Sequence, residues 1–347
     1  KGRVYSNDEI KNYLSKEYKH YNNQIIDLDK KLEAETEKVE LEGQSLRNFQ
    51  HCFGYSIEDL ELILHPMAED AKEATGSMGD DTPLAVLSDK YRPLYHYFRQ
   101  NFSQVTNPPI DSLRENKVMS LKTRFGNLGN ILDFSKLTKD NIYVLNSPIL
   151  SNAQFEKFLK FFGNNNKVLD CTFSKDDDLE TSINLLKVKS EQAVREGIKQ
   201  IILSDKNISE NRMPMPMLLC IGAINTHLVK LGLRGYVSIN VQTGDALDTH
   251  SFATLIGVGA TTVNPYLAFD SLYQRHSKKL FGNFTFDECV SRYIKSVNLG
   301  LLKIMSKMGI SVLSSYRGGC NFETVGLSRT IVKDYFPGML SKISGIG

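Results

Sequence analysis

The sequence predicts an α/β fold: a rudimentary or incomplete (β/α) barrel with mainly parallel strands, preceded by an N-terminal helical connector and an irregular arm. From about residue 140, apolar β-branched runs alternate with helix-forming stretches at intervals of roughly 30 residues, which is typical of a parallel sheet. Glycines follow several of the predicted helices, as in helix C-caps. Six such units are too few for a closed eight-fold barrel, and a doubly wound sheet fits them equally well.

The composition is that of a soluble globular protein of one large or two smaller domains. The chain has 347 residues, 41% of them hydrophobic and 24% charged, and a formal net charge of +2. This balance favours neither a nucleic-acid nor a membrane partner, and no run reaches the ~18 apolar residues of a membrane helix. We expect a cytoplasmic protein. The start at Lys1, without an initiator Met or a signal core, suggests a piece of something longer.

Metal ligands are dispersed along the chain. The five cysteines and seven histidines contain no Cys-x-x-Cys and no pairing at metal-ligand spacing. We therefore expect reduced thiols and no metal site. The acidic run 176–178 is predicted to be a solvated loop.

Residues 1–50 are predicted to be a polar helical connector. Ser6 followed by Glu9 is a capping box that opens a helix. The run 27–42 alternates acidic and basic residues, which is typical of a solvated surface.

Residues 51–137 are predicted to be an irregular arm. Ser56 and Asp59 cap a second helix, and Pro66 should end or kink it. The aromatic residues between Tyr91 and Phe102 have mostly helical spacing and are predicted to be core. A short helix follows near residues 114–121.

Residues 138–347 are predicted to form the barrel-like unit. Helices are expected at 152–162, 179–196, 215–231, 250–257 and over a longer region ending at Met308. Strands are expected at 142–145, 167–173, 200–205, 236–241, 261–265 and 310–314. Functional side chains of such folds lie at the carboxyl ends of the strands. The residues at those ends are Ser204, Asp205, Gln242, Thr243, Gly244, Asp245, Asn264, Tyr266, Ser315, Tyr316 and Arg317.

The arm contains the loop Gly-Ser-Met-Gly-Asp-Asp-Thr-Pro at 76–83, in which two glycines bracket Ser77 and Met78. Glycine permits a bend with exposed backbone amides. One interpretation is a tight turn with Met78 tucked into the core. The other is a loop whose Ser77, Met78 and Gly79 face a neighbouring site.

Several long motifs resemble the central domain of glutamate synthase, the large chain that makes glutamate from glutamine and 2-oxoglutarate. They lie at residues 58–69, 76–88, 104–111, 216–219, 233–234, 243–245, 257–260, 263–268, 305–311, 315–318 and 322–327. The sequence departs from the family at Asn225–His227 and Thr249–His250, where the family commonly carries further histidines. Roles resting on those histidines are not expected here.

The resemblance implies a domain between a glutamine amidotransferase domain and an FMN domain of the same chain, helping to wall an ammonia passage. It implies that Ser77, Met78 and Gly79 border the 2-oxoglutarate and flavin site, with no catalytic residue and no cofactor in this part. FMN and an iron–sulfur cluster would belong to the full-length enzyme, and the electron donor would be ferredoxin or an NAD(P)H-oxidising subunit. A plastid location would suit a plastid-bearing organism. The part alone is expected to be inactive.

Two other functions fit the residues considered without the family. One is a self-contained (β/α) enzyme that binds a phosphorylated or carboxylate ligand at the strand ends, and the other is a purely structural scaffold. Arg317, beside Gly318 and Gly319, could hold an oxyanion through its planar fork or close a salt bridge between loops.

Overall fold

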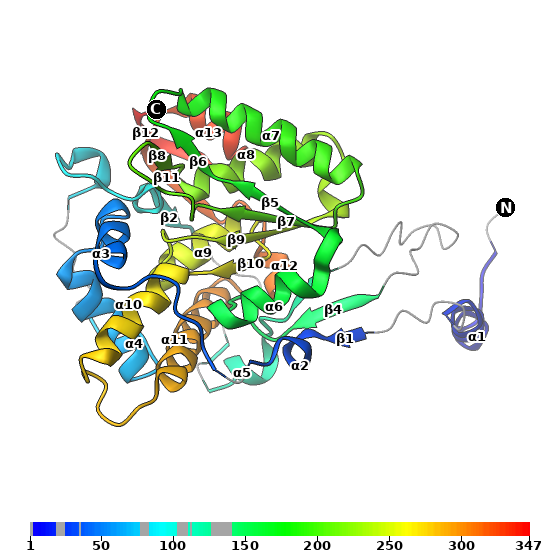
Figure 1. Ribbon diagram of the computed structural model, residues 1–347. Coiled ribbons are helices and arrows are strands. Elements are labelled where there is room, and N and C mark those ends of the chain that lie inside the picture. Colours follow the sequence, from blue (N-terminus) through cyan, green and yellow to red (C-terminus); the bar gives the residue numbers. More distant parts are fainter. Residues whose placement is uncertain are drawn as a thin grey trace.

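Four parallel strands form the centre of the molecule (Figure 1). The computed structural model describes residues 3–18, 25–34, 36–76, 83–102, 110–111, 113–125 and 141–347. The central sheet has the order β10-β9-β7-β5. Its strands are β5 (Asn166–Asp170), β7 (Gln200–Ser204), β9 (Ser238–Gln242) and β10 (Thr262–Asn264). All three pairings are parallel, which confirms the predicted parallel α/β unit.

The sheet does not close into a barrel within the described residues. Beyond β10 it continues only through a single parallel bridge between Val263 and Ile149, which lies just after β4. The three smaller sheets have the orders β1-β4-β3, β12-β11-β2 and β6-β8. Their strands are β1 (Ile25–Asp27), β2 (Phe98–Gln100), β3 (Thr123–Phe125), β4 (Ile142–Leu145), β6 (Thr172–Ser174), β8 (Arg212–Pro214), β11 (Phe322–Leu327) and β12 (Leu340–Ile346). The incomplete barrel predicted from the sequence is the fold observed.

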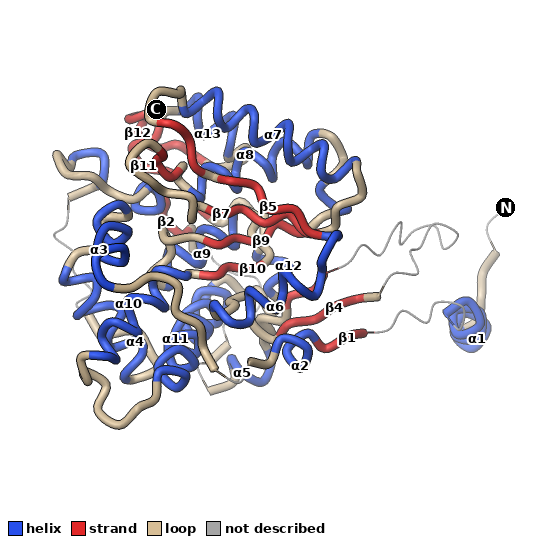
Figure 2. The backbone as a smooth tube through the Cα atoms, in the orientation of Figure 1, coloured by secondary structure: helices blue, strands red, loops and turns tan. Residues whose placement is uncertain are grey.

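Helices lie on both faces of the strands, whereas α1 lies apart from them (Figures 1 and 2). They are α1 (Asn7–Tyr18), α2 (Leu28–Leu32), α3 (Gly43–Cys52), α4 (His65–Glu69), α5 (Glu115–Val118), α6 (Asn152–Phe162), α7 (Leu179–Arg195), α8 (Met217–Lys230), α9 (Thr249–Val258), α10 (Tyr266–Ser277), α11 (Phe286–Lys307), α12 (Leu313–Tyr316) and α13 (Arg329–Tyr335). The largest apolar core joins α7, α8, α9 and α11 to one face of the central sheet. None of the helices described is long and apolar enough to cross a membrane.

The two faces of the central strands differ because their side chains alternate. Ile239 and Val241 of β9 point into the large apolar core, as do Ile201 and Leu203 of β7. The other face carries buried polar side chains in rows set by the strand register, such as Ser204, Gln242 and Asn264. The inner face of the incomplete barrel is therefore polar near the carboxyl ends of its strands.

Several local predictions are confirmed. Ser6 and Glu9 exchange the two hydrogen bonds of a capping box before α1. Ser56 and Asp59 do the same before the helical stretch that leads into α4. That stretch is a π-helix over Asp59–Leu64, whose wider turns spare Pro66 the clash with a carbonyl four residues earlier.

Other local predictions are wrong. Residues 310–314 form no strand: Val312 makes one bridge to Ser120, and α12 begins at Leu313. The predicted strand 142–145 exists as β4 but belongs to a peripheral sheet. The charged run 27–42 is not simply a solvated surface, because it contains α2 with its two leucines fully buried. The aromatic run 91–102 forms a 3-10 turn and β2. Tyr97 and Phe98 at its centre are in the core, as predicted, whereas Tyr91 and Phe102 at its ends are exposed.

Candidate functional site

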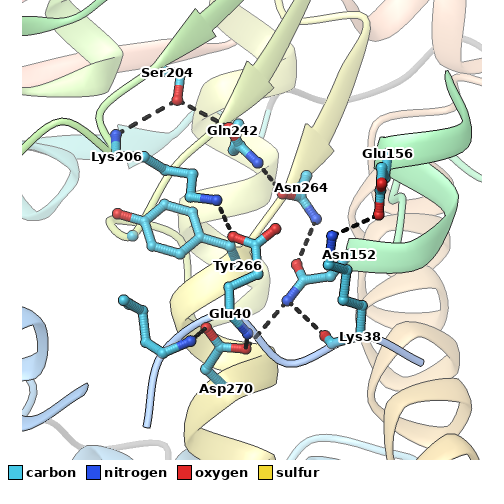
Figure 3. Close-up of polar contacts among 12 residues, drawn as sticks. Lys38, Glu40, Asn152, Glu156, Ser204, Lys206, Gln242, Asn264, Tyr266 and Asp270 are labelled. Atoms are coloured by element: carbon cyan, nitrogen blue, oxygen red, sulfur yellow. Dashed lines mark hydrogen bonds and ion pairs between the residues drawn. The ribbon is translucent and has the colours of Figure 1, made fainter. Parts of the chain in front are cut away.

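The carboxyl ends of β7, β9 and β10 carry a continuous hydrogen-bond network of buried side chains (Figure 3). Ser204 Oγ donates to Gln242 Oε1 at 2.9 Å, and Gln242 Nε2 donates to Asn264 Oδ1 at 3.3 Å. Asn264 Nδ2 then donates to Asn152 Oδ1 at 3.0 Å, at the start of α6. The predicted strand-end residues from 204 to 266 do come together at one edge.

The network continues into α10 and from there to the N-terminal segment. Asn152 Nδ2 donates to Asp270 Oδ1 at 3.2 Å and to the carbonyl of Lys38 at 3.1 Å. The two oxygens of Asp270 accept the backbone N–H groups of Glu40, at 3.2 Å, and Leu41, at 3.0 Å. One carboxylate thus fixes the backbone of the segment that runs across α10 between α2 and α3 (Figures 2 and 3).

Asp205 is the centre of a second group of contacts at this edge. It is fully buried, and its carboxylate accepts hydrogen bonds from the Thr243 hydroxyl, the Tyr266 hydroxyl at 2.9 Å and the Gly244 N–H at 3.1 Å. Burial raises the pKa of Asp205 to about 7, and the three donors oppose that rise. Burial also raises the pKa of Asp245 to about 6 and that of Asp270 to about 7.

A half-buried ion pair lies beside this group. Lys206 Nζ contacts the carboxylate of Glu40 and lies 5.6 Å from the centre of the Tyr266 ring. The lysine therefore joins the loop after β7 to the N-terminal segment and to α10 (Figure 3). Glu40 and Lys206 were not predicted as site residues, although Lys206 directly follows the predicted strand 200–205.

Aromatic side chains from α3 and from the residues just after it cover the carboxyl edge. Phe53, just after α3, packs against Gly244 so closely that a Cβ at position 244 would lie 2.4 Å from its ring. The Phe49 ring meets the Tyr266 ring edge-on at 6.3 Å, and Leu46 packs in the same cluster. Tyr55 donates its hydroxyl to the Gly244 carbonyl at 3.0 Å. The edge is filled by the chain's own side chains.

This arrangement does not fit a flavin or another phosphate-bearing cofactor. A phosphate needs free backbone N–H groups or cations, and the Gly244 N–H is already used by Asp205. The buried side chains of Asp205, Asp245 and Asp270 offer a phosphate no cation. Among the described residues, no three His, Cys, Asp or Glu side chains lie together in a way that could hold a metal ion.

The remaining predicted site residues lie elsewhere. Ser77, Met78 and Gly79 are outside the described residues. Tyr316 is buried and donates to Gln100 Oε1 at 2.6 Å. Gln100 lies on β2, which belongs to a different sheet from the network. Arg317 forms no ion pair within the described part of the chain, so the salt bridge considered from the sequence is not observed.

Sequence reasoning missed Asn152, Asn240 and Asp270. Asn240 could have been found, because polar residues alternate with apolar ones along β9. Its amide donates to Gln200 Oε1 at 3.0 Å and its oxygen accepts from the Thr262 hydroxyl at 2.7 Å. Asn152 and Asp270 lie on helices and carry no local pattern that marks them.

Comparison with known proteins identifies the family. The family model described as "Glutamate synthase central domain" matches residues 48–328. The large chain of the NADPH glutamate synthase of Azospirillum brasilense is 49% identical over 100% of this chain and 23% of its own length. The corresponding chain of Bacillus subtilis is 40% identical over 99% of this chain and 23% of its own, and ferredoxin-dependent glutamate synthase 1 of Arabidopsis thaliana is 38% identical over 99% and 22%.

The chain spans less than a quarter of the length of these curated relatives. Among solved structures, the flavin-binding domain of baker's yeast flavocytochrome b2 aligns with 46% of this chain and 44% of its own at 13% identity. The TM-score of that alignment is 0.29, which is too low to say anything about function. The family model and the full-length relatives agree with each other, and the chain belongs to the glutamate synthase central domain family.

Proposed function

We propose that this chain is the central part of a glutamate synthase, the oxidoreductase that makes L-glutamate from L-glutamine and 2-oxoglutarate. The observation that carries the proposal is the match of essentially the whole chain to one part of glutamate synthases from bacteria and a plant. Those relatives include NADPH-dependent and ferredoxin-dependent enzymes, so the electron donor of the whole protein is ferredoxin or an NAD(P)H-oxidising subunit.

The part performs no chemistry of its own in this proposal. Its carboxyl edge, where a ligand-binding (β/α) protein holds its ligand, is filled by Phe53, Phe49 and Tyr55. FMN and the iron–sulfur cluster then belong to other parts of the same protein. A protein of this kind works in the cytoplasm, or in the plastid of a plastid-bearing organism.

Each of three segments has a role. Residues 1–50 connect the chain to a glutamine amidotransferase domain, residues 51–137 form an arm, and residues 138–347 form the barrel-like unit that packs against the FMN domain. Together they help to wall the passage that carries ammonia. Within the arm, Ser77, Met78 and Gly79 border the 2-oxoglutarate and flavin site, and the unbranched Met78 side chain seals its wall.

The substitution Met78→Ala in the complete enzyme tests this role. Removing the side chain opens the pocket wall, so the KM for 2-oxoglutarate should rise several-fold while glutamine hydrolysis is unchanged. Met213→Ala is the matched control, because Met213 is 43% exposed on β8. Equal kinetics for wild type and both variants would refute the assignment of Met78.

A titration of the purified chain with FMN and 2-oxoglutarate, followed by visible absorbance, tests whether this part binds a flavin by itself. We expect no saturable change. Saturable flavin binding would mean that the chain keeps a cofactor site of its own and would refute the proposal for the barrel-like unit.

A further inference from the structure

Residues 43–55, which we call the lid, cover the carboxyl edge of the central sheet. They comprise α3 and the three residues after it. Their buried apolar side chains, Leu46 and Phe53, belong to a small cluster with Tyr266 that is separate from the large core. Parts of a protein with few buried apolar contacts open locally at the lowest cost in free energy. This arrangement allows the lid to leave the edge while the large core stays packed.

A glycine stands near each end of the lid. Gly43 has a φ of 57° and Gly54 a φ of 71°. Beyond Gly43, the Asp270 carboxylate holds the backbone N–H groups of residues 40–41, and beyond Gly54 the capping box of Ser56 begins the next helix. Hinges are element ends that absorb changes in φ and ψ, which glycine does most readily. The two glycines are therefore suited to be the hinges between the lid and its fixed flanks.

Asp205 lies beneath the lid but takes no hydrogen bond from it. Its donors among the described residues are the Thr243 hydroxyl, the Gly244 N–H and the Tyr266 hydroxyl. The lid covers two of these donors, because the Phe53 ring packs against Gly244 and the Phe49 ring meets the Tyr266 ring edge-on. The lid thus keeps water from the Asp205 carboxylate and gives it no hydrogen bond in return.

Asp245 lies beneath the same lid and is also buried. The Tyr55 hydroxyl contacts the backbone on both sides of it, at 3.0 Å from the Gly244 carbonyl and 3.4 Å from the Ala246 carbonyl. This hydroxyl satisfies carbonyl groups rather than the carboxylate. Opening the lid would therefore hydrate both aspartates and would break no hydrogen bond that the Asp205 carboxylate accepts.

The charges around the two aspartates do not balance them. Lys206, after β7, is already paired with Glu40. The other ionisable groups that face the two aspartates are Tyr266 of α10, Cys52 and Tyr55 of the lid, and Tyr91 and Tyr95 of the arm. Burial raises the pKa of each of these five above its usual value, so all are neutral from about pH 4 to about pH 8.

Ionisation of the two aspartates opposes closure of the lid. With the lid closed, burial raises the pKa of Asp205 to about 7 and that of Asp245 to about 6. With the lid open, water solvates both carboxylates, and each pKa falls toward the usual 3.8. The closed form therefore binds protons more tightly, and this advantage is lost as the pH rises from about 4 to about 7.

We propose that residues 43–55 are a pH-sensitive lid, which closes the carboxyl edge when Asp205 and Asp245 are protonated and opens it when they ionise. The open form exposes the polar network at the ends of β7, β9 and β10 to water. This behaviour belongs to the chain itself and does not depend on its proposed place in a glutamate synthase.

Amide hydrogen exchange of the 347-residue chain at pH 5 and pH 8, corrected for the intrinsic pH dependence of exchange, tests the proposal. The N–H groups of Phe53 and Tyr55, which donate to carbonyls within the lid, report on its opening, and those of β9 report on the whole fold. The opening equilibrium constant of the lid should rise about tenfold or more from pH 5 to pH 8. Unchanged protection, or protection equal to that of β9 at both pH values, would overturn the proposal.

Asparagine substitutions remove the ionisation and keep the shape of the side chains. Asp205→Asn and Asp245→Asn should each reduce the rise, and the double variant should remove most of it. Asp178→Asn is the matched control, because Asp178 caps α7 at the exposed surface. A rise as large in the variants as in wild type would contradict the lid. If Asp205→Asn fails to fold, Asp245→Asn provides the same comparison on its own.

Fluorescence gives a second, independent readout, because the chain contains no tryptophan. Phe49→Trp places a single probe at the contact between the lid and Tyr266. From pH 5 to pH 8 its emission should shift to longer wavelengths and acrylamide should quench it more strongly, because opening exposes the ring to water. Tyr236→Trp is the matched control, because Tyr236 is 59% exposed before β9. Quenching of the Phe49→Trp probe that does not change with pH would refute the opening.

Discussion

The substitution Gly244→Ala tests whether the carboxyl edge is sealed by the chain itself. A Cβ at position 244 would lie 2.4, 2.6 and 2.9 Å from three atoms of the Phe53 ring, whereas ordinary contacts begin near 3.4 Å. Both residues are buried, and the ring cannot rotate away without breaking its packing with Leu46 and Tyr266. Overpacking of this kind lowers the free energy of unfolding by about 1–3 kcal/mol.

A double-mutant cycle attributes the loss to this one contact. Phe53→Leu alone should lower the free energy of unfolding by about 1–2 kcal/mol, because it removes part of a buried ring. In the double variant the smaller leucine makes room for the methyl group added at position 244, so the combined loss should be smaller than the sum of the single losses by about 1 kcal/mol. The assay is urea unfolding followed by far-ultraviolet circular dichroism.

Gly235→Ala is the matched control, because position 235 is exposed and has no atom within 4 Å of its Cβ position. Its free energy of unfolding should change by less than about 0.5 kcal/mol. If Gly244→Ala were equally neutral, or if the two losses in the cycle simply added, Phe53 would not be packed into the strand ends, and the argument against a ligand at this edge would fail.

Two further predictions concern the charges at the same edge. The pKa values of Asp205 and Asp270 are raised to about 7 from 3.8, so the folded chain keeps protons that the unfolded chain releases. The free energy of unfolding should therefore fall as the pH rises from about 4 to about 7. Asp245, whose pKa is raised to about 6, contributes to this fall, so Asp245→Asn should reduce the difference between the urea midpoints at pH 5 and pH 8. Lys206→Met should lower the free energy of unfolding by about 1–2 kcal/mol by leaving Glu40 unpaired, whereas Lys160→Met, at a surface pair, should change it by less than about 0.5 kcal/mol in the same assay.

Elements whose determinants are local were predictable from the sequence. The two capping boxes at Ser6 and Ser56 are confirmed, because the residues that make them are three apart. Helix α6 has the predicted bounds, and its start is fixed by the capping box of Ser151. The carboxyl edge was also predictable in outline, because parallel strands place their ends together.

The wrong strand at 310–314 shows where local reasoning ends. Ile310, Val312 and Leu313 have strand propensity, but a strand also needs a neighbour with free backbone groups. The only neighbour found along the described residues is Ser120, which forms a single bridge to Val312. At Leu28 and Leu32 the prediction failed in the opposite direction, because a buried helix was missed. Their spacing of four is typical of a buried helix face, but the charged residues between them suggested a solvated surface.

The cover of the carboxyl edge was not predictable, because it depends on contacts between residues more than 180 apart. The Asp270 carboxylate accepts hydrogen bonds from the backbone N–H groups of Glu40 and Leu41, and the Phe53 ring packs against Gly244. Neither residue pair has a pattern that a single sequence reveals. The polar inner face depends on the side chains that cover it. Without that cover, water would reach the network and its aspartates would ionise. This dependence explains why the edge keeps the buried polar character of a binding site while its space is filled by the chain itself.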